Sequence, residues 1–246
     1  MNVPVICPSK GRAGRVLTLN AVEPLILCVG EEEKDIYHKE YPDVELMVHP
    51  DEVLGETGAH KWIHEQVGDM FIVDDDLVAL VQTYDPELPS REPPKHAYDI
   101  IQMVGDVARD VGVYLWGLAN SHDARYYNAN RPFRLSGYQN GYAFGLFAGS
   151  RIPMLDDPTF TMMDYYYSGM NAFYHRKVFC DTRWGFQQLN TFRGTGGLSE
   201  WRNTETERRC TERLIALFGE AVVPKVKAST AGHSRHDNEK LLKIPW

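Results

Sequence analysis

The sequence predicts an α/β fold with a mainly parallel central sheet flanked by helices. Short apolar runs of strand length alternate with segments of helical spacing through the first half of the chain, which is typical of strand–helix–strand units. Polar or charged loops follow several of these runs, at the edge where ligands bind in such sheets. A chain of 246 residues that is 43% hydrophobic is also long enough to bury a core.

Each expected strand is a short apolar run, and the expected helices lie between the strands or near the end of the chain. The strands are predicted at 3–7, 25–30, 44–49, 70–76, 113–120 and 178–181. The helices are predicted at 15–22, 31–41, 58–67, 96–112 and 204–220. Because no internal repeat or low-complexity segment divides the chain, we expect a single domain over residues 1–246.

Composition and charge exclude several classes of protein. The chain opens with no basic segment followed by an apolar one, and no apolar run approaches the ~20 residues that span a bilayer, so we expect a soluble, cytoplasmic protein with no membrane partner. Cys7, Cys28, Cys180 and Cys210 are far apart and form no CxxC pair, so we expect reduced core thiols. The net charge of −8 argues against broad attachment to polyanions but allows a local basic groove.

Three aspartates in a row, Asp74, Asp75 and Asp76, end the apolar run that begins at Met70. These like charges repel one another unless a positive group lies among them. Mg²⁺ or Mn²⁺ prefers oxygen ligands, often takes one or two carboxylates from the protein, and fills its other positions with water and phosphate oxygens. The alternative is a solvated turn in which one aspartate caps the next helix. The apolar strand before them favours a metal site.

The loop after the first strand is predicted to bind phosphates or a nucleobase. The candidate residues are Pro8, Ser9, Lys10 and Arg12. They surround a glycine, so backbone N–H groups and positive charges are available to a nucleotide. The loop lacks the glycine spacing of nucleotide-hydrolysing motors and of dinucleotide dehydrogenases. A second junction carries Gly58 and Lys61, which either face the nucleotide or belong to an ordinary helix start.

Together these segments resemble GT-A glycosyltransferases, and within that fold the TET-associated glycosyltransferases of bacteriophages. The resemblance rests on VICPSKGR, the strand that DDD ends, SGYQNGYAFGLFAG, and the region from Met163-Asp164 to DTRWG. It implies a GT-A type nucleotide-diphospho-sugar transferase fold, with a nucleotide-sugar-binding half at 1–115 and an acceptor-binding and catalytic half at 116–246. It also implies a UDP-sugar donor and Mn²⁺ or Mg²⁺ as the cofactor.

The resemblance assigns roles on the donor side of the reaction. It implies that Asp74 and Asp76 hold the metal and that Asp74 and Asp75 contribute to binding the nucleotide sugar. A histidine near the end of the chain completes the metal site in many GT-A enzymes, and His233 fills that place here, with His236 as the fallback. Arg235 lies beside them in sequence and is expected to reach the diphosphate.

The resemblance also indicates the catalytic base. GT-A enzymes carry a pair of acidic residues at the start of a helix, and Met163-Asp164 fills this slot with one carboxylate. Asp164 is therefore the expected base that takes the proton of the acceptor hydroxyl. Asp157, together with Asp156, is the competing candidate, with a role in a turn or helix cap as the alternative for both.

The implied acceptor is the hydroxyl of 5-hydroxymethylcytosine in phage DNA, a base that an oxygenase makes first. Such a base would have to leave the duplex to reach the site. The aromatic residues available for stacking are Trp116, Tyr126, Tyr127, Phe133, Tyr138 and Tyr142, and the arginines available for phosphates are Arg125, Arg131 and Arg134. Three alternatives remain: a glycan, lipid or protein acceptor; a non-catalytic module that binds nucleotides or DNA; and a nucleotidyltransferase, which would share the metal and the phosphate loop but need no late base.

Overall fold

The computed structural model describes residues 2–85, 87, 91–189, 203–224 and 240–243, and its centre is a nine-stranded sheet. The strands are β1 (Val5–Pro8), β2 (Ile26–Gly30), β3 (Leu46–His49), β4 (Met70–Val73), β5 (Leu77–Gln82), β6 (Leu115–Ala119), β7 (Phe133–Arg134), β8 (Ala143–Leu146) and β9 (Phe179–Gln188). Their order is β3-β2-β1-β4-β8-β6-β9-β5, and β7 pairs with β9. A separate two-stranded sheet pairs β10 (Val222–Pro224) with β11 (Lys240–Leu242).

The central sheet is mainly parallel. Strand β1 pairs in parallel with β2 and β4, β2 pairs in parallel with β3, and β6 pairs in parallel with β9. Strand β8 runs antiparallel to its neighbours β4 and β6, and β5 and β7 run antiparallel to β9. The carboxyl ends of β1, β4 and β9 consequently lie at the same edge of the sheet. The predicted α/β class is confirmed.

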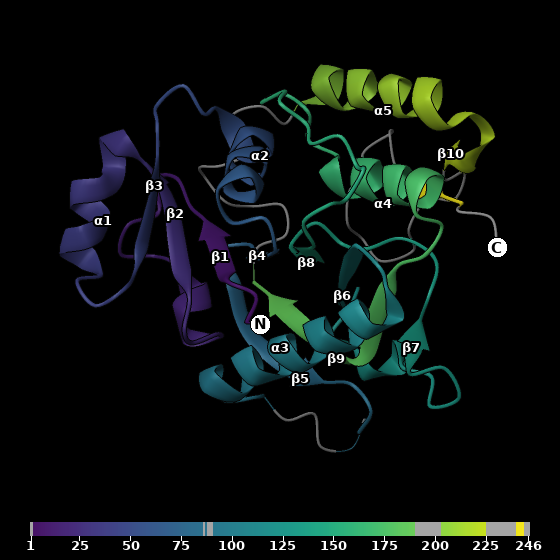
Figure 1. Ribbon diagram of the computed structural model, residues 1–246, viewed down its shortest axis with the longest axis horizontal. Coiled ribbons are helices and arrows are strands. Elements are labelled where there is room, and N and C mark those ends of the chain that lie inside the picture. Colours follow the sequence, from purple (N-terminus) through teal and green to yellow (C-terminus); the bar gives the residue numbers. More distant parts are fainter. Residues whose placement is uncertain (1, 86, 88–90, 190–202, 225–239, 244–246) are drawn as a thin grey trace.

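Helices cover both faces of the sheet. They are α1 (Lys34–Glu40), α2 (Gly55–Val67), α3 (Pro94–Val111), α4 (Met163–Tyr174) and α5 (Thr204–Phe218). Figure 1 shows α2, α4 and α5 gathered on one side of the sheet and α3 on the other. The alternation of side chains along a strand explains both layers, because successive residues point to opposite faces.

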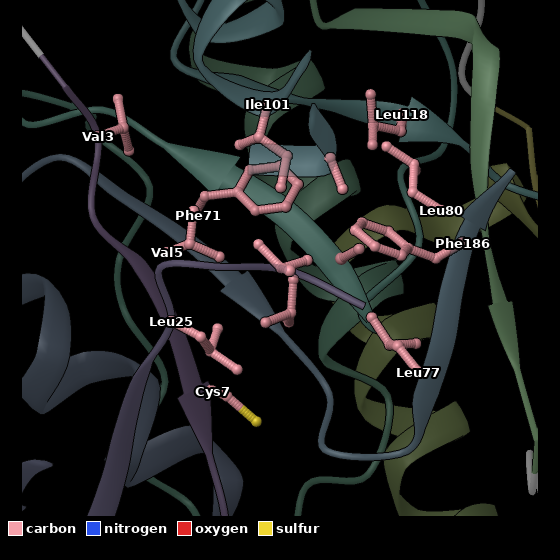
Figure 2. Close-up of a cluster of buried hydrophobic side chains, with 14 of the residues drawn as sticks. Val3, Val5, Cys7, Leu25, Phe71, Leu77, Leu80, Ile101, Leu118 and Phe186 are labelled. Carbon is pink, nitrogen blue, oxygen red and sulfur yellow. The ribbon is translucent and has the colours of Figure 1, made fainter. Parts of the chain in front are cut away.

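The apolar core consists of two clusters, one on each face. On the α3 side, Val5 and Cys7 of β1 lie with Phe71 of β4 and Ile101 of α3 (Figure 2). On the other side, Ile6 of β1 packs with residues of α2, α4 and α5. Every residue of β1 and β4 except Pro8 is buried, so these two strands form a rigid base for the loops that follow them.

The cysteines and the helices also bear on what the composition predicts. All four cysteines are buried free thiols, which confirms the prediction. Among the described helices, none combines the length and apolar character required to cross a bilayer.

The structure corrects several of the predicted elements. Instead of a helix at 15–22 there is a short 3-10 helix, Leu17–Asn20, because Leu17 N–H donates to the carbonyl of Asp75 and Thr18 Oγ1 to that of Asp74. Strand β5 was not predicted, since its apolar run follows the aspartates directly. Strand β9 extends to Gln188 rather than ending near Asp181.

Helix α2 begins three residues earlier than predicted, at Gly55. Gly55 has a positive φ of 68°, and a Cβ there would lie 2.8 Å from Pro158 Cα, so only glycine fits this close approach. The earlier start places Glu56 in the first turn of the helix. Gly58, predicted at the helix start, is instead buried inside the helix.

A fully buried histidine in α2 makes folding stability depend on pH. His60 is 1% exposed, and neither of its ring nitrogens has a hydrogen-bond partner within the described residues. Glu56 Oε1 lies 4.0 Å from His60 Nε2, which is too far for a hydrogen bond. Burial lowers the pKa of His60 from 6.5 to about 3, so the imidazole is neutral in the folded protein.

We expect this histidine to destabilise the fold in acid. Between pH 6.5 and about 3 the unfolded chain binds a proton at His60 that the folded protein does not. The free energy of unfolding therefore falls as the pH drops through this window, by up to about 1.4 kcal/mol per pH unit. Urea unfolding at several pH values should show a shallower slope for His60→Phe than for the wild type. Equal slopes would contradict the assignment.

Candidate active site

The three aspartates form the turn between β4 and β5, and backbone contacts hold this turn in place. Asp74 N–H donates to the carbonyl of Tyr142 at 2.8 Å, which joins the turn to the segment before β8. Thr18 Oγ1 donates to the Asp74 carbonyl at 2.5 Å and accepts from Leu77 N–H at 3.1 Å. These contacts hold the backbone of the turn at Asp74 and at Leu77.

Asp75 joins the turn to the loop after β1. Ser9 Oγ donates to Asp75 Oδ2 at 2.8 Å, and Arg12 Nη1 lies 3.2 Å from Asp75 Oδ1. The Tyr37 hydroxyl lies 2.9 Å from Ser9 Oγ and accepts from Arg12 N–H at 3.0 Å. Burial raises the pKa of Tyr37 to about 12, so it remains a neutral phenol. Two segments that the sequence predicts to act together are thus in direct contact.

Asp74 and Asp76 converge on one nitrogen atom. Gln188 Nε2, at the end of β9, donates to Asp76 Oδ1 at 2.8 Å and to Asp74 Oδ2 at 3.2 Å. Asp76 is buried, at 6% exposure, and Asp74 is half-buried. Oxygen atoms of two carboxylates therefore lie around a single position at the carboxyl edge of the sheet.

The negative charge around Asp74 is larger than the sequence indicates. Burial raises the pKa of Asp74 well above its usual value, and the charges of Glu56, Asp76 and Asp75 raise it further, while Arg12 acts in the opposite direction. Glu56 belongs to the first turn of α2, at the side of Asp74. Such a concentration of carboxylates is stabilised by a cation.

The donor set fits a hard divalent cation. Asp74 and Asp76 supply two carboxylates, the number that Mg²⁺ or Mn²⁺ commonly takes from a protein when phosphates and water supply the rest. Within the described residues, no three side chains of His, Cys, Asp or Glu form a metal cluster. His233 and Arg235, predicted to complete the donor site, lie outside the described residues.

Asp164 opens α4 beside the same edge. Its Oδ2 accepts a hydrogen bond from the Tyr138 hydroxyl, and its Oδ1 accepts one from Tyr165 N–H at 2.9 Å. Gly141 packs directly against Asp164, since a Cβ added to this glycine would lie 3.2 Å from Asp164 Cβ. Since the neighbouring Tyr142 carbonyl binds Asp74 N–H, the dipeptide 141–142 lies between Asp164 and the aspartate turn.

Tyr138 is held so that its hydroxyl reaches Asp164. The Tyr138 carbonyl accepts from Asn120 Nδ2 at 2.8 Å, and its ring lies 5.1 Å from that of Tyr165. Burial and the charge of Asp164 raise the pKa of Tyr138 well above its usual value. The phenol thus stays protonated and donates to the carboxylate.

Asp157, the competing candidate for the base, is engaged elsewhere. Its Oδ1 accepts from Thr159 N–H at 3.1 Å and from Thr159 Oγ1 at 2.6 Å, and its Oδ2 lies 2.9 Å from Arg213 Nη1. Burial works to raise its pKa, but these hydrogen bonds and the arginine charges outweigh it and lower the pKa. This is the turn role that the sequence analysis gave as the alternative.

The remaining candidates are placed as follows. Pro8 ends β1, and Lys10 is exposed in the loop after it. Lys61 Nζ donates to Asp156 Oδ2 at 2.6 Å, so this lysine and Asp156 form an ion pair. Gly58 packs near Val53, since a Cβ there would lie 3.5 Å from Val53 Cγ1.

The proposed stacking residues divide into buried and exposed groups. Trp116 was wrongly included, because it is fully buried. Its ring packs so closely on Gly145 that a Cβ added to this glycine would lie only 2.0 Å from it. Arg134 points inward, where it donates to the carbonyls of Ser136 and Tyr138. Tyr126 and Phe133, in contrast, are 77% and 45% exposed.

Four residues of the site were missed in the sequence: Glu56, Gln188, Tyr138 as a partner of Asp164, and Tyr37. Glu56 stands two positions before Gly58, and its place follows from the true start of α2. Gln188 is a polar residue at the end of an apolar strand, the same signal that revealed the aspartates, but the predicted strand was too short to include it. No local pattern distinguishes Tyr37 or Tyr138 from other tyrosines of the chain.

Comparisons with known proteins agree with the resemblance seen in the sequence. Residues 3–120, which hold the loop after β1 and the three aspartates, match the model of the family described as TET-Associated Glycosyltransferase. No curated protein matches the chain.

Solved structures of three nucleotide-dependent enzymes also match, at low identity. UDP-glucose pyrophosphorylase complexed with UDP-glucose is 6% identical, with 77% of this chain and 93% of that chain covered and a TM-score of 0.39. CMP:2-keto-3-deoxy-manno-octonic acid synthetase complexed with CTP is 10% identical (88% and 98% covered, TM-score 0.40). The inositol-1-phosphate CTP transferase from T. maritima is 12% identical (89% and 97% covered, TM-score 0.37).

Proposed function

We propose that this chain, whose residues 3–120 match the TET-Associated Glycosyltransferase model, is a glycosyltransferase that moves a sugar from a UDP-sugar to the hydroxyl of 5-hydroxymethylcytosine in phage DNA. We also propose that the transfer depends on a divalent metal. One observation carries this proposal. The loop after β1, the aspartate turn and Asp164 meet at one edge of the sheet, although they are far apart in the sequence.

On the donor side, Asp74 and Asp76 would hold Mn²⁺ or Mg²⁺, with His233 as the further ligand that the resemblance implies. When bound, such an ion neutralises negative charge on a departing diphosphate. Ser9 and Arg12 are positioned by Asp75, so the loop keeps one shape. The exposed Lys10 is available to the nucleotide, whereas the N–H groups of Ser9, Gly11 and Arg12 already donate within the protein.

On the acceptor side, Asp164 takes the proton of the attacking hydroxyl. A general base has to lie within hydrogen-bond reach of that proton, and the position of Asp164 at the start of α4 is fixed by Tyr165 N–H and the Tyr138 hydroxyl. Removing the proton makes the hydroxyl oxygen a better nucleophile towards the anomeric carbon. The sugar is then transferred with inversion.

Exposed arginine and aromatic side chains support a nucleic acid as the acceptor. Tyr126 offers an exposed ring for stacking, and Arg131 is exposed a few residues later. Phe133 stacks on Phe179, and Arg125 pairs with Asp123. A target base inside a duplex cannot reach a carboxylate in a pocket, so it must be flipped out or presented in a single strand. The acidic net charge of −8 favours a contact confined to this region.

Replacing Tyr138 with phenylalanine should shift the pH dependence of the transfer. The variant removes the hydrogen bond to Asp164 while keeping the ring, and a carboxylate that loses a donor becomes harder to deprotonate. We expect the acidic limb of the kcat profile to move to higher pH, with the largest loss of rate at the acidic end. An unchanged profile would show that Tyr138 has no part in positioning the base.

Nucleoside mass spectrometry tests the proposed function. DNA that contains 5-hydroxymethylcytosine is incubated with the protein, Mn²⁺ and a panel of UDP-sugars, and free UDP is measured in the same tubes. The proposal predicts a sugar-sized gain in mass on the modified base and none on unmodified cytosine. UDP release with no change in the DNA would overturn the proposed acceptor and indicate a glycan, lipid or protein. Absence of both signals would overturn the proposed reaction.

A further inference from the structure

The neutral amide of Gln188 occupies a position between two carboxylates where a positive charge would be expected. Its Nε2 donates to Asp76 Oδ1 at 2.8 Å and to Asp74 Oδ2 at 3.2 Å. Asp75, in contrast, has a cationic partner in Arg12. We propose that Gln188 is itself a ligand of the divalent cation and binds it through Oε1, an inference that rests on the proposed metal-dependent function.

The chemistry of the amide allows this exchange. A glutamine side chain carries a donor nitrogen and an acceptor oxygen on the same carbon. Half a turn about its last rotatable bond exchanges the two atoms, and this bond has a broad, roughly two-fold preference. The nitrogen suits the two carboxylates alone, and the oxygen suits a cation held by the same carboxylates. Amide oxygens are established ligands of hard divalent cations.

The sheet, rather than a loop, fixes the position of Gln188. It pairs with Leu77, the residue directly after Asp76, in the antiparallel ladder between β5 and β9. The next residue, Leu189, donates its N–H to the Asp76 carbonyl at 3.2 Å. The Cα of Gln188 is therefore held beside the aspartate turn, and only the side chain has to move.

Gln188 would add a neutral oxygen ligand to the two carboxylates of the site. Within the described residues, Asp74 and Asp76 have no third His, Cys, Asp or Glu that completes a metal cluster. A glutamine supplies the missing oxygen without adding negative charge to a region that already holds Glu56 and Asp75. Two carboxylates and one amide oxygen would then bind the cation, and hard cations commonly accept such a mixture of carboxylate and carbonyl oxygens.

The chain offers a matched control one residue away. Side chains alternate along a strand, so Gln187 points away from the aspartate turn. Its Oε1 accepts a hydrogen bond from Arg91 Nη2 at 3.1 Å instead. Substitutions at 187 and 188 thus introduce the same chemical change on opposite faces of β9.

The test measures Mn²⁺ binding directly, by the loss of the EPR signal of free Mn²⁺, on the full chain with and without UDP. Gln188→Glu adds a third charged oxygen and should bind Mn²⁺ about tenfold tighter than the wild type, because ligand charge sets the affinity of such sites. Gln188→Ala should bind it roughly fivefold more weakly. Gln187→Glu should leave the affinity unchanged.

Thermal denaturation in EDTA and in Mn²⁺ is the second readout. Gln188→Glu should melt at a lower temperature than Gln187→Glu in EDTA, because three carboxylates then repel one another, and Mn²⁺ should raise its midpoint by more than that of the wild type. This comparison does not depend on the folding of Gln188→Ala.

Two outcomes would overturn the inference. If Gln188→Ala binds Mn²⁺ as tightly as the wild type or tighter, the amide only competes with the cation. If Gln188→Glu binds no tighter than Gln187→Glu, residue 188 does not reach the cation. Failure of the wild type itself to bind Mn²⁺, even with UDP, is a separate result, because it contradicts the proposed metal dependence as well.

Discussion

Replacing Asp76 with asparagine is expected to lower the rate of sugar transfer by about 10²–10³-fold, because the metal proposed to stabilise the departing diphosphate would lose a charged ligand. Asparagine has nearly the same shape, and its Oδ1 can still accept the hydrogen bond from Gln188, so the turn keeps its structure. The rate is measured as UDP release at saturating donor and acceptor. Raising the Mn²⁺ concentration should restore part of the activity.

The control for this experiment is Asp69→Asn, at the opposite end of the same strand. Asp69 directly precedes β4, accepts from Ala148 N–H at 2.8 Å and pairs with Arg109 at 2.9 Å. This variant also removes one negative charge, but away from the carboxyl edge, and should keep its activity at temperatures where it is folded. Full metal-dependent turnover by Asp76→Asn would disprove the assignment of Asp76 as a ligand.

Replacing Asp164 with asparagine is expected to lower kcat by about 10²–10⁴-fold, the usual contribution of a general base. The asparagine Oδ1 can still accept from Tyr165 N–H, and its Nδ2 can donate to the Tyr138 hydroxyl oxygen, but the amide cannot take a proton from the acceptor. Donor binding should remain close to that of the wild type, because Asp164 lies on the acceptor side. Single-turnover kinetics with preloaded donor separates these two effects.

Asp157→Asn is the comparison that makes this test specific. Its carboxylate is bound by Thr159 and Arg213, so the substitution should lower the thermal midpoint and leave kcat near the wild-type value. The assignment of the base fails if Asp164→Asn keeps its activity while Asp157→Asn loses it.

The sequence predicted the parts of the site that lie next to each other along the chain. An apolar run followed by Asp74–Asp76, and another followed by Ser9 and Arg12, mark the ends of two buried strands. Parallel strands bring their carboxyl ends to one edge, so the contact between Asp75 and Arg12 could be anticipated.

The rest of the site depends on contacts between distant residues, which no local pattern reveals. Glu56 reaches Asp74 because Gly55 packs against Pro158, about a hundred residues later, and starts α2 early. Gln188 reaches Asp74 and Asp76 because of the pairing of β5 with β9. Trp116 was misjudged for the same reason. Its ring packs against Gly105 and Gly145 inside the core, and these contacts are between residues that are distant in the sequence.

The most direct test of the central claim is calorimetric titration of UDP-sugar into the wild type and into Asp76→Asn, each in Mn²⁺ and in EDTA. If the carboxyl edge of the sheet holds the donor through a cation at Asp74 and Asp76, the wild type should bind the donor at least about tenfold more tightly in Mn²⁺. Asp76→Asn should bind it weakly in both conditions. Equal affinity of the wild type in Mn²⁺ and in EDTA, retained by Asp76→Asn, would contradict the claim.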